Sequence, residues 1–93
     1  MPEAAPPDET AEHRLKRLRM RSMRRGIKEM DIILGRFADT GLHDLDQAGL
    51  GLYDALLSEN DHDLYQWVTG HTAPPPRFSD LIDRIARVST PTG

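Results

Sequence analysis

The chain has 93 residues, no cysteine and a formal net charge of −3. This length allows one small domain, and the lack of cysteine excludes disulfides and thiolate metal sites. No apolar run approaches the roughly 20 residues that a helix needs to cross a bilayer. The acids near the N-terminus argue against a secretory signal and against a mitochondrial transit peptide, so the sequence predicts a cytoplasmic protein.

The charges are segregated along the chain. Residues 14–28 hold eight Lys or Arg and no acid, whereas residues 29–71 hold nine acids and a single arginine, Arg36. Segregation of this kind usually serves association with other molecules and does not determine a fold.

Composition divides the chain into three parts. Residues 1–10 are rich in proline and polar side chains, which predicts a disordered N-terminal extension. Residues 11–88 are expected to form a single helical domain, and residues 89–93 a flexible tail.

Two helices are predicted in the first half of the domain. The first covers about 11–23, with Thr10 or Asp8 as its cap, and Gly26 is expected to end it. The second covers about 27–39 and ends at Gly41. Its buried stripe consists of Ile27, Met30, Leu34 and Phe37.

Three further helices are predicted over 47–58, 62–69 and 77–88. Asp46 caps the first of them, Asn60 or Asp61 caps the second, and Gly70 ends the second. Residues 74–76 are prolines and should form a rigid extended linker. No segment alternates with period two, so the expected fold is all-α, a small five-helix bundle, and a monomer.

The sequence offers little for catalysis. It has no glycine-rich phosphate loop and no nucleophile motif. The groups His43-Asp44-x-Asp46 and Asp61-His62-Asp63 could suggest a divalent metal, but helix caps explain the same acids, and we favour the caps. The sequence therefore predicts a binding module without a metal, and not an enzyme.

The basic segment 14–28 allows several interpretations. It could bind nucleic acid or an anionic membrane surface, or it could pair with the acids of its own domain. The acidic remainder of the chain and the lack of stacking aromatics argue against nucleic acid. Trp67, the single tryptophan, is expected in the core, whereas Tyr65 is expected to be an exposed contact residue.

Two segments together resemble a known family. Arg25-Gly26-Ile27-Lys28-Glu29, followed by Met30-Asp31-Ile32, resembles the R-G-x-x-E-L/M-D motif of the SdhE-type flavinylation factors of succinate dehydrogenase. The stretch from Leu56 to Trp67 resembles the family's L-L-x-x-x-D-x-D-L-[FY]-x-W segment, with His62 where the family often has proline. The resemblance covers about residues 14–88.

The resemblance implies a small five-helix fold and a function. Members of this family bind the flavoprotein subunit of succinate dehydrogenase, and often that of fumarate reductase, and promote covalent attachment of FAD to it as assembly chaperones. No FAD is expected to stay bound to this chain. The residues matching the family as partner contacts are Arg25, Gly26, Glu29, Asp31 and Tyr65. Those matching as structural or interface residues are Asp61, Asp63 and Trp67.

The RGxxE motif also has a physical interpretation. Gly26, which lacks a Cβ, can adopt a positive φ and leaves room for the backbone of a partner. Arg25 and Glu29 would flank this gap and offer a cation and an anion to the partner. An internal Arg25–Glu29 pair, worth only about 0.2–0.5 kcal/mol, is the alternative.

Overall fold

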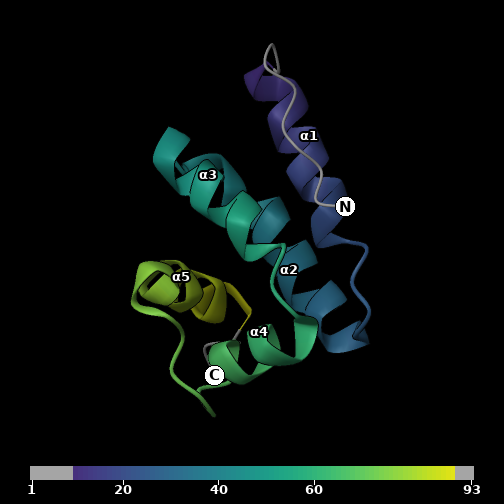
Figure 1. The fold of residues 1–93 in the computed structure, drawn as a ribbon. Coiled ribbons are helices and arrows are strands. Elements are labelled where there is room, and N and C mark those ends of the chain that lie inside the picture. Colours follow the sequence, from purple (N-terminus) through teal and green to yellow (C-terminus); the bar gives the residue numbers. More distant parts are fainter. Residues whose placement is uncertain (1–9, 90–93) are drawn as a thin grey trace.

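The computed structural model describes residues 10–89, with side chains up to residue 88, as an assembly of short helices (Figure 1). The α-helices are α1 (Ala11–Ser22), α2 (Lys28–Thr40), α3 (Gln47–Leu56), α4 (Asp61–Val68) and α5 (Ser79–Ser89), and two 3₁₀ turns are η1 (Leu42–Asp44) and η2 (Pro76–Phe78). Residues 10–89 contain no strand, so the prediction of a small all-α bundle with five helices is confirmed. None of these helices is both long and apolar enough to span a membrane.

Helix α2 occupies the centre of the bundle. It packs against α1, α4 and α5, and α4 packs in turn against α5. Figure 1 shows α1 running down toward the start of α2, which returns through the middle of the molecule. Because the connection between α1 and α2 is short, the two helices form a hairpin whose bend carries the RGxxE motif.

The helix boundaries follow the predicted caps closely. The Thr10 hydroxyl accepts from the His13 N–H at 3.1 Å, the Asp46 carboxylate from the Gly49 N–H at 2.7 Å, and the Asn60 amide oxygen from the His62 N–H at 2.8 Å. Each of these bonds satisfies a backbone donor that the first turn of a helix leaves free.

The core lies between α2 and the helices around it. The predicted α2 stripe is buried at Met30, Leu34 and Phe37. The Phe37 ring packs against the Tyr53 ring at a centroid distance of 5.3 Å. The remaining buried apolar residues are Leu18, Ala38, Leu42, Leu50, Leu56, Leu57, Leu64, Phe78, Leu81, Ile82 and Ile85.

Gly26 does not have the role that the sequence predicted. Helix α1 ends earlier, at Ser22, and the N–H of Met23 bonds back to the carbonyls of Met20 and Arg21. The glycine with a positive φ among the described residues is Gly70, at 82°, which ends α4 as expected. Gly26 lies beyond the helix end, in the bend between α1 and α2. Polar contacts determine the path of the backbone there, and Gly26 does not adopt a positive φ.

The other boundary differences are small. Pro75 is extended, as predicted for the proline run, but Pro76 opens the turn η2, where the missing N–H of proline costs nothing. The predicted extension 1–10 and tail 89–93 lie mostly outside the described residues, so the disorder predicted for them stays a prediction.

Gly41 provides a test of the packing around α2. A Cβ on Gly41 would lie 2.6 Å from Cε1 of the buried Phe37 ring, whereas a Cβ on Gly35 would meet nothing within 4 Å. We expect Gly41→Ala to lower the free energy of unfolding by about 1–3 kcal/mol through overpacking. The matched control Gly35→Ala should raise it by about 0.5–1 kcal/mol, because alanine favours the helix. Urea unfolding followed by circular dichroism measures both, and equal effects would contradict the packing described here.

Candidate functional site

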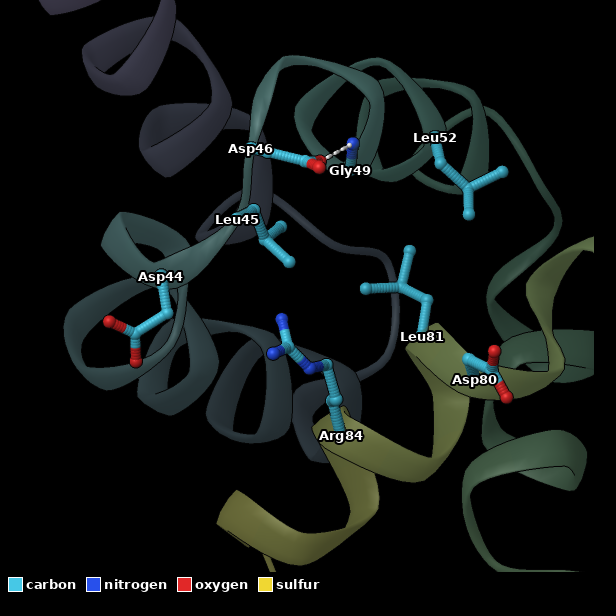
Figure 2. A pocket seen from close by; sticks show the side chains of 8 residues that line it. All are labelled: Asp44, Leu45, Asp46, Gly49, Leu52, Asp80, Leu81 and Arg84. Atoms are coloured by element: carbon cyan, nitrogen blue, oxygen red, sulfur yellow. Dashed lines mark hydrogen bonds between the residues drawn. The ribbon is translucent and has the colours of Figure 1, made fainter.

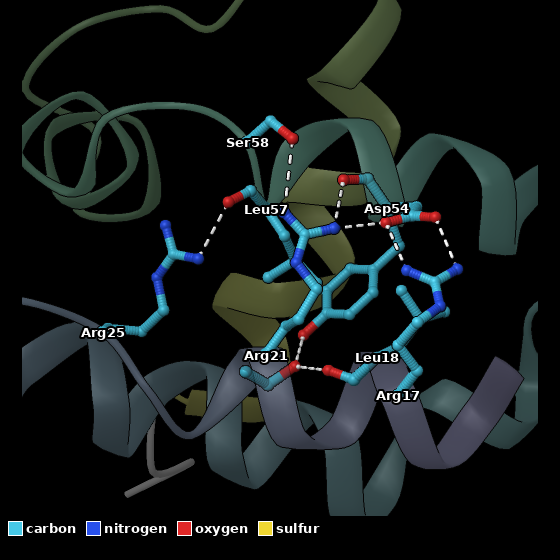
Figure 3. Close-up of polar contacts among 9 residues, drawn as sticks. Arg17, Leu18, Arg21, Arg25, Asp54, Leu57 and Ser58 are labelled. Atoms are coloured by element: carbon cyan, nitrogen blue, oxygen red, sulfur yellow. Dashed lines mark hydrogen bonds and ion pairs between the residues drawn. The ribbon is translucent and has the colours of Figure 1, made fainter. Parts of the chain in front are cut away.

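The Arg25 side chain is the most heavily bonded part of the bend between α1 and α2. It is only 9% exposed and forms an ion pair with Asp61, which is 16% exposed. Its Nε donates to Asp61 Oδ1 at 2.6 Å, and its two Nη atoms donate to the carbonyls of Leu57, at 2.8 Å, and Glu59, at 3.2 Å. The bond to Leu57 is visible in Figure 3. Arg25 therefore connects the bend to the α3–α4 connection.

The same bend is held by its backbone. The Gly26 N–H donates to Asp61 Oδ2 at 2.7 Å, and the Arg25 N–H donates to Asp31 Oδ1 at 2.6 Å. We call these four residues, Arg25, Gly26, Asp31 and Asp61, the Arg25–Asp61 clasp. The clasp joins the two segments that the sequence singled out into one structural unit.

The clasp corrects the expected role of Arg25. The sequence placed its guanidinium on the rim of a partner-binding gap, but the guanidinium is turned inward. The carbonyls that follow the end of α3 at Leu56 lack helical partners, and the planar fork of an arginine can bond two of them and a carboxylate together. The alternative Arg25–Glu29 pair does not form either, because Asp61 holds the guanidinium.

Glu29 and Gly26 face outward. Both are exposed, and Glu29 lies in the first turn of α2, where the helix dipole favours an acid. A Cβ on Gly26 would lie at an ordinary 3.4 Å from Asp61 Oδ2, so the domain has room for a side chain there. The outward surface of the motif is thus Gly26, Lys28 and Glu29.

The α4 residues divide between core and surface. Trp67 is half-buried, with its ring 6.1 Å from the Phe78 ring, which confirms core packing. Tyr65 is also half-buried and packs against the core, so the expectation of an exposed tyrosine is wrong. Its position on α4 turns it toward the apolar cluster. Asp63 is exposed in the first turn of α4.

The inward arginines of α1 meet a single acid on α3. Arg17 donates to Asp54 through Nη1 at 3.2 Å and Nη2 at 2.8 Å, and Arg21 forms a second ion pair with the same carboxylate (Figure 3). On the outer side, Arg19 pairs with Asp39 of α2. The interpretation that the basic helix pairs with the acids of its own domain is therefore confirmed.

Sequence reasoning did not single out Asp54, although a signal was present. Asp54 is the only charged residue in the segment 47–58. Burial alone would raise the pKa of Asp54, but the Arg17 hydrogen bond and the charges of Arg17, Arg21 and Arg14 outweigh burial and hold that pKa below its ordinary value.

A buried polar pair lies beside this contact. The hydroxyl of Tyr53 bonds to that of Ser22, which also lies within hydrogen-bonding distance of the Leu18 carbonyl, at 2.7 Å. Burial raises the pKa of Tyr53 to about 12, although the Ser22 bond and the charges of Arg25 and Arg21 act in the opposite direction. The tyrosine is thus a neutral hydrogen-bonding residue that links α1 to α3.

A pocket of about 290 Å³ opens on another side of the domain (Figure 2). Its lining residues are Asp44, Leu45, Asp46, Gly49, Leu52, Asp80, Leu81 and Arg84. It includes two acids of the predicted His/Asp groups, but Asp46 caps α3, as the favoured interpretation had it. Within residues 10–89, no three His, Cys, Asp or Glu side chains lie close enough to hold a metal ion. The pocket shares no residue with the clasp.

Comparison with known proteins covers most of the helical domain. A family model described as "Flavinator of succinate dehydrogenase" matches residues 16–89. The mitochondrial succinate dehydrogenase assembly factor 2-B of Drosophila mojavensis is 36% identical over 84 residues, which are 88% of this chain and 54% of the relative. The mitochondrial succinate dehydrogenase assembly factor 2 of Meyerozyma guilliermondii is 43% identical over 75 residues, which are 77% of this chain and 56% of the relative. The chain spans about half the length of these curated relatives.

The relatives contradict the predicted cytoplasmic location. Their names place them in mitochondria. Because of this finding, the prediction of a cytoplasmic protein is wrong. The prediction depended on a few acidic residues near the N-terminus. Targeting signals are short segments read by receptors, so a few acidic side chains do not decide the location.

The clasp makes a prediction about stability. Asp61→Asn removes the charge that faces the buried Arg25 guanidinium, so we expect the free energy of unfolding to fall by about 1–3 kcal/mol, less than for a fully buried pair because Asp61 is partly exposed. Asp63→Asn is the matched control in the same helical turn and should cost less than about 1 kcal/mol. Similar losses in the two variants, measured in urea, would mean that the ion pair does not hold the bend.

The lowered pKa of Asp54 makes the domain sensitive to acid. Because that pKa is lower in the folded chain than its ordinary value of 3.8, Asp54 stabilises the fold above about pH 3.8, and this stabilisation is lost as the pH falls through the folded value. We expect the difference in unfolding free energy between wild type and Asp54→Asn to be largest near neutral pH and to shrink below pH 3.8. Urea titrations across this range measure it, and a difference independent of pH would contradict the assignment.

Proposed function

Because this chain belongs to the family of succinate dehydrogenase flavinators, we propose that it binds the flavoprotein subunit of succinate dehydrogenase and promotes covalent attachment of FAD to that subunit. The observation that carries the proposal is the pair of family-like segments, 25–31 and 56–67, which the clasp unites at one end of the bundle. Fumarate reductase is a second client that we propose on the family resemblance alone.

The outward part of the motif is the surface that we propose for docking. The clasp holds the bend rigidly, so Gly26 and Glu29 are presented to a partner in a fixed position. A surface that is ordered before binding loses less conformational entropy when the complex forms. Arg25 and Asp61 contribute to binding by positioning these residues, and not by touching the partner.

We propose that this protein acts by positioning and supplies no acid, base or cofactor. FAD and the residue that becomes attached to it both belong to the flavoprotein. A partner that binds one flavoprotein conformation more tightly than the others increases the population of that conformation. If FAD and its attachment site meet in that conformation, the bond forms faster because the reacting groups are already oriented.

The proposal predicts a defined response to surface changes. Glu29→Ala and Gly26→Arg should each weaken binding to the flavoprotein subunit and lower the covalent flavin that it acquires, while the helical content stays unchanged, since Glu29 is exposed and Gly26 has room for a side chain. Asp83→Ala, which removes an exposed acid of α5, is the control and should behave as wild type. Fluorescence of the denatured flavoprotein in a gel measures the covalent flavin.

Two results would overturn the proposal. One is covalent flavin that forms at the same rate with and without this protein. The other is the absence of a complex with the flavoprotein subunit on gel filtration. Loss of helical content in Glu29→Ala or Gly26→Arg would instead mean that the motif is structural and that docking occurs elsewhere.

A further inference from the structure

Three large apolar side chains are strongly exposed among residues 10–88. They are Met20, Met23 and Ile32, exposed by 46%, 48% and 49%. All three lie near the bend that the clasp holds, at the end of α1 and the start of α2. Single exposed apolar residues are common on protein surfaces, but their restriction to one hairpin calls for an explanation.

Helical geometry places these side chains on one side of the hairpin. The Arg19–Asp39 ion pair marks the exposed side on which α1 and α2 meet. Met23 follows Arg19 by four residues, and Ile32 precedes Asp39 by seven, so each lies on the same face of its helix as the ion pair. Met20 precedes Met23 by three residues, so its exposed side chain neighbours that of Met23 on this face. The three side chains therefore share the outer surface of α1 and α2.

The charged residues of this surface are largely without partners in the domain. The side chains of Lys16, Arg24, Lys28 and Arg36 are exposed, and no described residue forms an ion pair or hydrogen bond with them. Glu29 and Glu12, which precedes Lys16 by four residues, are the accompanying exposed acids, so the four cations exceed the acids by two charges. The inward arginines of α1, in contrast, are engaged with Asp54. We call Met20, Met23, Ile32 and these six charged residues the α1–α2 face.

We propose that the α1–α2 face binds an acidic surface of the flavoprotein, with Met20, Met23 and Ile32 entering apolar sockets there. This inference depends on the proposed function and adds the chemistry of the partner surface. Methionine and arginine are enriched in protein interfaces, and the flexible methionine side chain adapts to irregular sockets. An excess of cations on this face favours a partner of opposite charge and speeds their encounter.

Other anionic partners fit this face less well. Single-stranded nucleic acid is usually bound through aromatic side chains that stack on bases, and the α1–α2 face has none. A membrane surface is usually bound by a continuous apolar stripe along a helix. The apolar residues Leu15 and Leu18 of α1 are instead directed into the domain core. Three separate apolar side chains among cations are therefore better matched to small apolar pockets on a protein surface than to a membrane or a nucleic acid.

The first test removes the apolar anchors. The triple variant Met20→Ser, Met23→Ser, Ile32→Ser should raise the dissociation constant for the purified flavoprotein subunit about tenfold or more, mainly through faster dissociation. The control triple variant Thr72→Ser, Arg84→Ser, Arg87→Ser alters exposed positions outside the α1–α2 face, and should change the constant less than threefold. Biolayer interferometry gives both rates, and circular dichroism checks that the helices are retained.

The second test concerns charge. Lys28→Glu with Arg36→Glu should slow association and make it less dependent on salt, whereas Arg84→Glu with Arg87→Glu on α5 is the matched control and should leave the rate unchanged. Equal association rates for the two double variants would overturn the assignment of an acidic partner surface.

The outcomes separate this inference from the proposed function. If wild type binds the flavoprotein and the anchor variant binds equally well, the α1–α2 face is not the docking surface, while the proposed function stands. If wild type does not bind the flavoprotein, both fail. Vesicles of phosphatidylcholine and phosphatidylglycerol and a single-stranded oligonucleotide serve as further probes. Tighter binding to either of these than to the flavoprotein, lost in the anchor variant, would also overturn the inference.

Discussion

The ion pair between Arg25 and Asp61 is the interaction on which the functional end of this domain depends. It closes the end of α3, holds the start of α4 and fixes the bend between α1 and α2. Two connections that are distant in sequence, the α1–α2 bend and the α3–α4 connection, thus share one guanidinium. A lysine could not replace this arrangement, since only the planar fork of arginine reaches a carboxylate and two carbonyls together.

A second charged contact organises the other side of α1. Arg17 and Arg21 converge on Asp54, and the Ser22–Tyr53 hydrogen bond lies next to them in the core. A helix with so many cations would repel itself in isolation. Here the inward Arg17 and Arg21 pair with one acid of α3, the outward Arg19 pairs with Asp39 of α2, and Lys16 remains exposed. Some cations of the basic segment are therefore paired with acids inside the domain, and others are exposed together on one surface.

These two contacts explain how a small domain can serve as a docking module. The clasp and the Asp54 contact hold α1, α2 and α3 in fixed relative positions. The exposed residues of the α1–α2 bend are therefore ordered although they face solvent. The mechanism proposed for this family member needs only such a rigid surface, because the flavin chemistry takes place in the partner. The motif residues accordingly divide into those that build the surface, Arg25 and Asp61, and those that face outward, Gly26 and Glu29.

The sequence by itself determined the helices, their caps and the core stripe of α2, because hydrophobic periodicity and capping are local properties. It also pointed to the two family segments, since these are short and spaced regularly. Only the tertiary structure decided which way each motif side chain points. Arg25 turns inward because Asp61, Leu57 and Glu59 lie more than 30 residues away in sequence and reach it only after folding. Tyr65 packs against the core for the same reason, since neighbouring helices, and not its own segment, decide whether a half-apolar side chain is covered.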